Sequence, residues 1–174
     1  MNNVDIRKVV PADIERLVTI GQKTFLDTYG ALNTEENMRA YLESHFSKQR
    51  LTSELNDANI VYYFAVIDGV VIGYLKLNFG EAQTELKGEH SLEIERIYVL
   101  KEYQGKKLGQ RFCRHAVEVA QQRQLDFVWL GVWEQNTKAI EFYEKNGFVA
   151  FDQHVFVLGD EEQTDLMMKF EVVS

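Results

Sequence analysis

The middle of the chain reads LEIERIYVLKEYQGKKLGQRFCRHAVEVAQQ from Leu92 to Gln122, and this stretch decides the fold. Its first part alternates along the chain as far as Val99, which predicts a β-strand. A turn rich in glycine and lysine follows, and the pattern is helical from Gly105 to Gln122. That helix has one apolar stripe, formed by Leu108, Phe112, Ala116, Val119 and Ala120. The stripe predicts a helix that packs on a sheet.

The segments on either side supply further strands and helices. Strands are expected at residues 4–10, 61–67, 70–78, 127–132, 149–158 and 164–171. Helices are expected at residues 12–28, 33–46, 48–55 and 137–146. Asp68-Gly69 predicts a tight hairpin, and Gly159-Asp160 predicts a second turn. This order predicts an α+β fold, a single domain over residues 1–174 in which helices cover a mixed sheet.

Composition excludes several classes of protein. The 174 residues, 45% of them apolar, are enough for one packed core. A net charge of -8 argues against nucleic-acid binding and would help attract a cationic substrate. A cytoplasmic protein without membrane contact is expected, because no signal peptide or apolar run of roughly 20 residues is present. One cysteine allows no internal disulfide, and the histidines have no metal-ligand spacing: Cys113, His45, His90, His115 and His154.

The central strand carries two carboxylates that are candidates for acid–base chemistry. Period-two alternation puts Glu93 and Glu95 on one face, together with Ile97 and Val99. Burial and mutual repulsion would raise the pKa of at least one carboxylate, which suits a general base for an ammonium group. The alternative is a strand whose charged side faces solvent. The segment by itself does not decide between the two.

The turn after this strand has the features of an anion site. Its glycines would let backbone N–H groups approach a pyrophosphate, and the following helix would add partial positive charge. Lys106 and Lys107 would add full positive charge. Alone this is a weak motif, because glycine and lysine are common before helices. It is not a P-loop, which needs Gly-Lys-Ser/Thr after a longer spacing.

A third segment, NTKAIEFYEKNGF at residues 136–148, combines a helix with a buried tyrosine. Asn136 is a candidate helix cap, and Gly147 is a candidate helix end. Ala139, Ile140 and Tyr143 share one face, which would point the phenol of Tyr143 inward, where it needs a hydrogen-bond partner. The alternative is an ordinary core tyrosine.

Taken together, these motifs resemble those of the GNAT N-acetyltransferases over nearly the whole chain. QGKKLG at residues 104–109 resembles the pyrophosphate signature Gln/Arg-x-x-Gly-x-Gly/Ala. Residues 136–148 resemble the signature Asn-x-x-Ala-x-x-Phe-Tyr-x-x-x-Gly-Phe, one strand later. Lys107 departs from the family, in which most members have glycine. The resemblance implies the GNAT fold, with a mostly antiparallel central sheet flanked by helices, and acetyl-CoA as co-substrate without a metal.

The resemblance also implies a role for each matching residue. Backbone groups of Ile97, Tyr98 and Val99 would pair with the pantetheine arm of the co-substrate. Asn136 would hydrogen-bond the pantetheine, and Lys138 or Lys145 would reach the nucleotide. Tyr143 would protonate the departing thiolate, and the base would be Glu93, Glu95 or a water relay. The pyrophosphate would be held by amides of Gln104, Gly105, Lys106, Lys107, Leu108, Gly109 and Gln110.

The acceptor amine is the least determined feature of this hypothesis. Segments near the N-terminus resemble those of the PaiA-type spermine/spermidine acetyltransferases, which makes a polyamine the first choice. The residues expected to contact it are Asp27, Tyr29, Glu35, Glu36 and Tyr41. Protein N-termini or lysines are the second choice, and a non-catalytic acyl-CoA-binding regulator is a third. The resemblance also allows a homodimer, with the strand near Val155 as a candidate edge.

Overall fold

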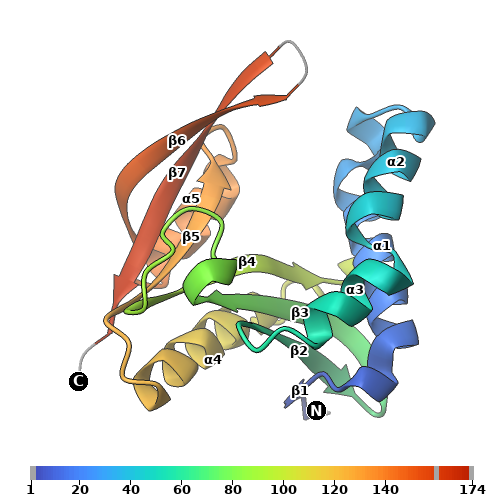
Figure 1. The fold of residues 1–174 in the computed structure, drawn as a ribbon, viewed down its shortest axis with the longest axis horizontal. Helices are drawn as coiled ribbons and strands as arrows, with labels where there is room; N and C mark the ends of the chain where they lie inside the picture. Colours follow the sequence, from blue (N-terminus) through green and yellow to red (C-terminus); the bar gives the residue numbers. More distant parts are fainter. Residues whose placement is uncertain (1–2, 159–160, 173–174) are drawn as a thin grey trace. The chain divides into compact units, whose positions relative to one another are not determined.

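The computed structural model describes residues 3–158 and 161–172 of the chain (Figure 1). Within these residues the α-helices are α1 (Ile14–Tyr29), α2 (Glu35–His45), α3 (Lys48–Leu55), α4 (Leu108–Gln122) and α5 (Thr137–Lys145). The strands are β1 (Asp5–Lys8), β2 (Ile60–Ile67), β3 (Val70–Phe79), β4 (Ser91–Val99), β5 (Phe127–Trp133), β6 (Val149–Leu158) and β7 (Glu161–Glu171).

The strands form a mixed sheet in the order β1-β2-β3-β4-β5-β7-β6. β4 and β5 pair in parallel, whereas β1 with β2, β5 with β7 and β6 with β7 pair antiparallel. The predicted α+β class and mixed sheet are therefore confirmed. β6 is the last strand in this order, so Val155 lies on an edge strand, as expected.

The chain divides into two compact units, and the division cuts through β3 and β4. The first unit contains the chain up to Lys76 together with Arg96–Gly109. Helix α3 begins at Lys48, as the sequence predicts, whereas α1 and α2 each begin two residues later than predicted. Thr34 and Ser47 accept backbone N–H groups at the starts of α2 and α3. Its core contains Leu17, Ile20, Phe25, Phe46, Leu51, Tyr62, Phe64 and Tyr74.

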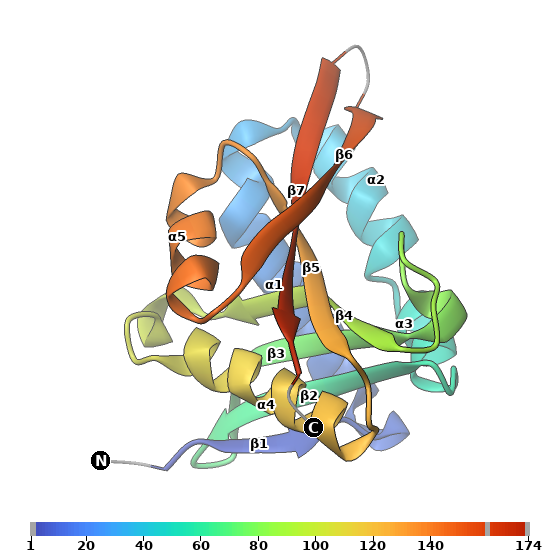
Figure 2. The same ribbon diagram turned by 90° about the vertical axis from the view of Figure 1, so that its left-hand side faces the viewer.

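The second unit contains Leu77–Glu95 and the chain from Gln110 onward. In it, β5, β7 and β6 lie side by side, with α5 next to them (Figure 2). The apolar stripe predicted for α4 is buried, which confirms that helix. The largest buried side chains of this unit include Phe112, Trp129 and Phe148.

Further boundaries also differ from the sequence prediction. α4 begins at Leu108 rather than Gly105, because Gly105 and Lys107 have positive φ angles of 84° and 62°, which a right-handed helix cannot contain. β7 begins at Glu161 rather than Thr164, since its first residues are polar and hide the strand pattern. A 3₁₀ turn at Pro11–Asp13 precedes α1. The predicted turn at Gly159-Asp160 lies outside the described residues.

Candidate active site

The second unit joins the two predicted carboxylates through one side-chain amide. Asn78, near the end of β3, donates from Nδ2 to Glu95 Oε1 at 2.7 Å and to Glu93 Oε1 at 3.1 Å. Asn78 is fully buried and Glu93 is 4% exposed, while Glu95 is half-buried. The structure therefore brings Glu93 and Glu95 together, and the solvent-facing alternative is wrong for Glu93.

A second set of bonds fixes Glu93 from the segment between β3 and β4. The backbone N–H of Thr84 donates to Glu93 Oε1 at 2.8 Å, and its hydroxyl donates to Oε2 at 2.6 Å. The neighbouring Gln83 is buried, and its side-chain oxygen accepts from Ser91 at 2.9 Å and from the Trp129 indole at 2.7 Å. The segment between β3 and β4 is thus anchored to Glu93.

The electrostatics of Glu93 match the predicted direction. Burial raises the pKa of Glu93, and the charge of Glu95 adds to this. Hydrogen bonds from Thr84 and Asn78 lower the pKa and offset part of the rise. The net pKa is above the ordinary value of a glutamate, so Glu93 resists ionisation more than an exposed carboxyl group.

Sequence reasoning missed Asn78 and Thr84. The signal available for Asn78 was a polar residue near the end of an otherwise largely apolar strand, VVIGYLKLNF. Thr84 gave no local signal, because its partner Glu93 is nine residues away.

The end of β4 lies in the first unit, where Ile97, Tyr98 and Val99 are half-buried. The Tyr98 ring packs against Tyr74, with ring centroids 5.8 Å apart. Burial raises the pKa of Tyr98, with further contributions from Tyr29 and Tyr74. Tyr29 was predicted to contact the acceptor amine, and Tyr98 was predicted to contact the co-substrate. The structure brings these two tyrosines together.

The predicted pyrophosphate turn alternates left-handed residues before a 15-residue helix. Gly105 and Lys107 both have left-handed φ angles, and such alternation turns successive N–H groups toward one side as an anion nest. Gln104 is held by its side chain, which donates to the Val99 carbonyl at 3.1 Å. The ammonium of Lys106 lies 5.3 Å from the Tyr103 ring centroid. Lys107 therefore adopts a left-handed conformation, which glycine takes more readily than other residues.

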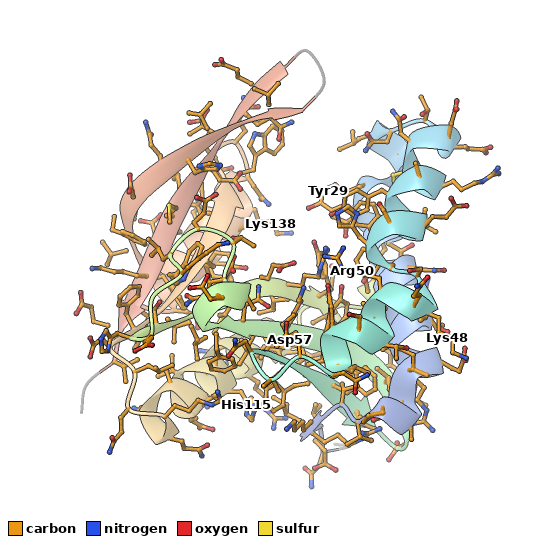
Figure 3. All side chains as sticks on the ribbon, in the orientation of Figure 1. Tyr29, Lys48, Arg50, Asp57, His115 and Lys138 are labelled. Atoms are coloured by element: carbon orange, nitrogen blue, oxygen red, sulfur yellow. The ribbon has the colours of Figure 1, made fainter. Side chains whose placement is uncertain are left out.

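Helix α5 holds the tyrosine proposed as acid. Asn136 caps the helix, because its side-chain oxygen accepts the Ala139 N–H at 3.2 Å. Tyr143 is half-buried, with ring contacts to Phe142 and Phe148 at 5.2 and 5.8 Å. Lys138 (Figure 3) and Lys145 are exposed on the same helix. The helix ends as predicted at Gly147, whose φ is 92° and where a Cβ atom would lie 2.8 Å from Phe170.

The predicted acceptor residues on α1 and α2 separate onto two surfaces. Tyr41 stacks on Phe25 at 4.3 Å and on His45 at 4.1 Å, and Tyr29, at the end of α1 (Figure 3), tilts against Phe25 at 4.8 Å. Asp27 pairs with Lys23 at 3.2 Å. Glu35 instead lines a groove of about 520 Å³ with Leu26, Met38, Leu42 and Glu43 among its other residues.

Within residues 3–158 and 161–172, no three His, Cys, Asp or Glu side chains gather in a way that would hold a metal ion. No helix in that part of the chain has the length and the apolar run that a membrane crossing needs.

Comparison with known proteins identifies the family. Residues 23–148 match the model of the acetyltransferase (GNAT) family. An uncharacterized N-acetyltransferase of Lactobacillus delbrueckii subsp. lactis, from the pepI 3' region, is 39% identical over 99% of this chain and 100% of its own. A spermidine N(1)-acetyltransferase of Thermoplasma acidophilum is 27% identical over 86% of this chain and 91% of its own.

A solved structure extends the comparison to the fold. The PaiA N-acetyltransferase of Thermoplasma acidophilum, in complex with coenzyme A, superposes with a TM-score of 0.77 at 25% identity. The match covers 97% of this chain and 99% of that one. These findings confirm the predicted enzyme class, an acetyl-CoA-dependent N-acetyltransferase, and the chain belongs to the acetyltransferase (GNAT) family.

Proposed function

We propose that this enzyme acetylates a polyamine of the spermidine or spermine class. The observation that carries the proposal is the aromatic face of α1 and α2, where Phe25, Tyr41 and His45 stack in sequence. The faces of Tyr41 lie against Phe25 and His45, so Tyr29, which is 38% exposed at the end of α1, would be the ring that meets an ammonium group. The net charge of -8 favours the approach of a polycation. The name of the Thermoplasma acidophilum spermidine N(1)-acetyltransferase supports the same substrate class.

The co-substrate would be held mainly by backbone groups. Amides of the segment Gln104, Gly105, Lys106, Lys107, Leu108, Gly109 and Gln110 would bind the pyrophosphate, because left-handed residues before a helix N-terminus favour an anion. Ile97, Tyr98 and Val99 would pair with the pantetheine arm. The side-chain amide of Asn136 keeps its N–H₂ group for the pantetheine, since its oxygen caps α5. Lys138 and Lys145 would reach the nucleotide.

The chemistry would be a direct transfer without a covalent enzyme intermediate. A carboxylate of the Glu93–Glu95 pair takes a proton from the ammonium, which frees the nitrogen lone pair to attack the thioester carbonyl. The N–H of Ile97 polarises that carbonyl. The C–S bond then breaks, and the Tyr143 hydroxyl protonates the departing sulfur.

Two measurements test the class and the substrate. Thiol release from acetyl-CoA is followed with spermidine, spermine, an aminoglycoside, free amino acids and an N-terminal peptide. Turnover confined to the polyamines supports the proposal, whereas turnover confined to the peptide replaces it with protein acetylation. Coenzyme A binding without turnover of any amine would indicate a non-catalytic regulator.

Two variant pairs test the assigned residues. Tyr143→Phe is expected to lower kcat about 100-fold with unchanged coenzyme A affinity, while the matched Tyr63→Phe on β2 leaves kcat unchanged. Tyr41→Leu removes the stack and is expected to raise the KM for spermidine, while Tyr41→Phe keeps the ring and the KM. Full turnover by Tyr143→Phe at every pH would show that another group protonates the sulfur.

A further inference from the structure

One buried amide, that of Asn78, connects the two carboxylates that the proposed reaction requires. Its Nδ2 group lies 2.7 Å from Glu95 and 3.1 Å from Glu93, and the residue has no exposed surface. An amide nitrogen has two hydrogens, so one goes to each carboxylate. Like-charged groups this close repel each other, and a shared donor is the simplest way to hold both.

The orientation of this amide is fixed by chemistry. Ionised carboxylates only accept hydrogen bonds, so the N–H₂ end must face them and the oxygen must point away. Asn78 Oδ1 is buried and receives no hydrogen bond from residues 3–158 or 161–172. The geometry of the buried amide is thus set by its bonds to Glu93 and Glu95.

The two carboxylates are not equivalent. Glu93 is 4% exposed and accepts three hydrogen bonds, two from Thr84 and one from Asn78. Both of its carboxylate oxygens accept hydrogen bonds from the protein, so a ligand has little access to them. Glu95 is half-buried, so its carboxylate is the more accessible member of the pair.

We propose that Asn78 is a positioning residue that holds Glu95 ready to accept the proton of the acceptor amine, while Glu93 serves as a fixed anchor. This inference rests on the proposed function, since it assigns the proton acceptor of that reaction. In the step, an ammonium N–H bond breaks, its electron pair stays on nitrogen, and the proton goes to a Glu95 oxygen. Nitrogen can then attack the thioester.

The groups around Glu93 and Glu95 influence the pKa values that a pH experiment would measure. β3 contributes Asn78, the segment before β4 contributes Thr84, and β5 places Trp129 in register with Glu93. The neighbouring cations along the strands have partners in the first unit. Lys76 pairs with Glu54 at 3.1 Å, and Arg96 stacks 4.5 Å from the centre of the Phe46 ring.

The test measures the pH profile of kcat/KM for Asn78→Ala and Asn78→Asp. Asn78→Ala removes the donor shared by Glu93 and Glu95, which destabilises their ionised forms. The acid limb of the kcat/KM profile should therefore move up by about one pH unit. Below the limb, kcat/KM should then fall about tenfold. Asn78→Asp keeps the volume and adds a third carboxylate, so its shift should be larger. It also replaces Asn78→Ala if that variant does not fold.

A matched control distinguishes the two carboxylates. Thr84→Val removes only the hydroxyl bond to Glu93, so it should leave the acid limb in place. An equal shift in Thr84→Val and Asn78→Ala would make Glu93 the acceptor and overturn the assignment. An unshifted limb in both Asn78 variants would overturn the positioning role.

A measurement on the enzyme without an acceptor amine tests the role of Asn78 independently of the proposed substrate. The side-chain carboxyl carbons of Glu93 and Glu95 are titrated by ¹³C NMR in the free enzyme. Asn78→Ala should raise both midpoints, and Thr84→Val should raise that of Glu93 mainly. Unchanged midpoints in Asn78→Ala would overturn the inference. If spermidine is not a substrate, the thiol-release assay shows this and the NMR titration is unaffected. The pH profile of kcat/KM is then measured with the amine that is turned over.

Discussion

Among the residues whose burial the structure describes, each unit buries one glutamate, and the two differ in their partners. Glu54 in the first unit is 7% exposed and contacts Lys76 at 3.1 Å, Arg50 at 2.9 Å and the Tyr62 hydroxyl at 2.5 Å. Glu93 in the second unit is 4% exposed, and its neighbours include the neutral donors Asn78 and Thr84 and another carboxylate, Glu95. The two glutamates are buried to a similar extent, so they differ mainly in the charge of their hydrogen-bond partners.

The two pKa values consequently move in opposite directions. Burial alone would raise the pKa of Glu54, but Lys76, Tyr62 and Arg50 outweigh it and lower the pKa. For Glu93, burial prevails over the bonds from Thr84 and Asn78, and the pKa rises. Cationic partners therefore keep the buried Glu54 ionised, whereas burial without them holds the pKa of Glu93 above its ordinary value.

The largest expected effect is on the first of these acids. Glu54→Gln removes the carboxylate that lies 3.1 Å from the ammonium of Lys76, which is 4% exposed. The free energy of unfolding should fall by about 3–5 kcal/mol, because removing one member of a buried ion pair is costly. Urea denaturation at pH 7 measures this, and kcat per folded molecule should stay unchanged.

The double variant Glu54→Gln/Lys76→Met sharpens this prediction. It removes both charges, so it should recover much of the lost stability. If the double variant is as unstable as the single one, the hydrogen bond to Tyr62 rather than the ion pair holds this region.

The effect of Glu54→Gln should depend on pH. The pKa of Glu54 is lowered in the folded protein, so its contribution is present above about 4.5, the ordinary value of a glutamate, and lost as the pH falls through the folded pKa. The stability difference between the wild type and Glu54→Gln should therefore shrink in acid. A constant difference from pH 7 to pH 3 would contradict the ion pair.

Glu93→Gln should change stability little and with the opposite sign. Glutamine keeps an acceptor for the Thr84 N–H and removes a charge from a buried site, so a gain of about 1 kcal/mol or less is expected at pH 7. The folded pKa of Glu93 is raised, so the stability contributed by this acid is full below about 4.5 and declines as the pH rises through the folded pKa. The advantage of Glu93→Gln should accordingly disappear in acid, and a large loss at pH 7 would show that Glu93 acts as a structural ion.

The contrast between these acids shows what a sequence can predict. The helices, the strands and the pairing of Glu93 with Glu95 follow from local periodicity, and the structure confirms them. Glu54 looked like an ordinary polar residue of the helix KQRLTSEL, because Lys76 is 22 positions away. Hydrogen-bond partners and burial arise from contacts between distant segments, which local periodicity does not contain.

Two further differences have physical reasons of their own. Nothing in the residue type at Lys107 signals a left-handed conformation, so the start of α4 was placed three residues early. Glu35 and Tyr41 are six residues apart on α2, and a helix turns positions so spaced onto different sides. The roles of these residues, and of Tyr143, Glu93 and Glu95, stay predictions that the variants above test.

The smallest expected effect comes from a third acid, which separates the influence of burial from that of charge. Glu85 contacts His154 at 3.1 Å, with side chains 37% and 43% exposed. Water screens such a pair, so Glu85→Gln should change the free energy of unfolding by less than about 0.5 kcal/mol at pH 6. Addition of 1 M NaCl should remove the remaining difference, since exposed pairs are screened by salt. A loss comparable to that of Glu54→Gln would mean that pairing with a cation, rather than burial, sets the size of these effects.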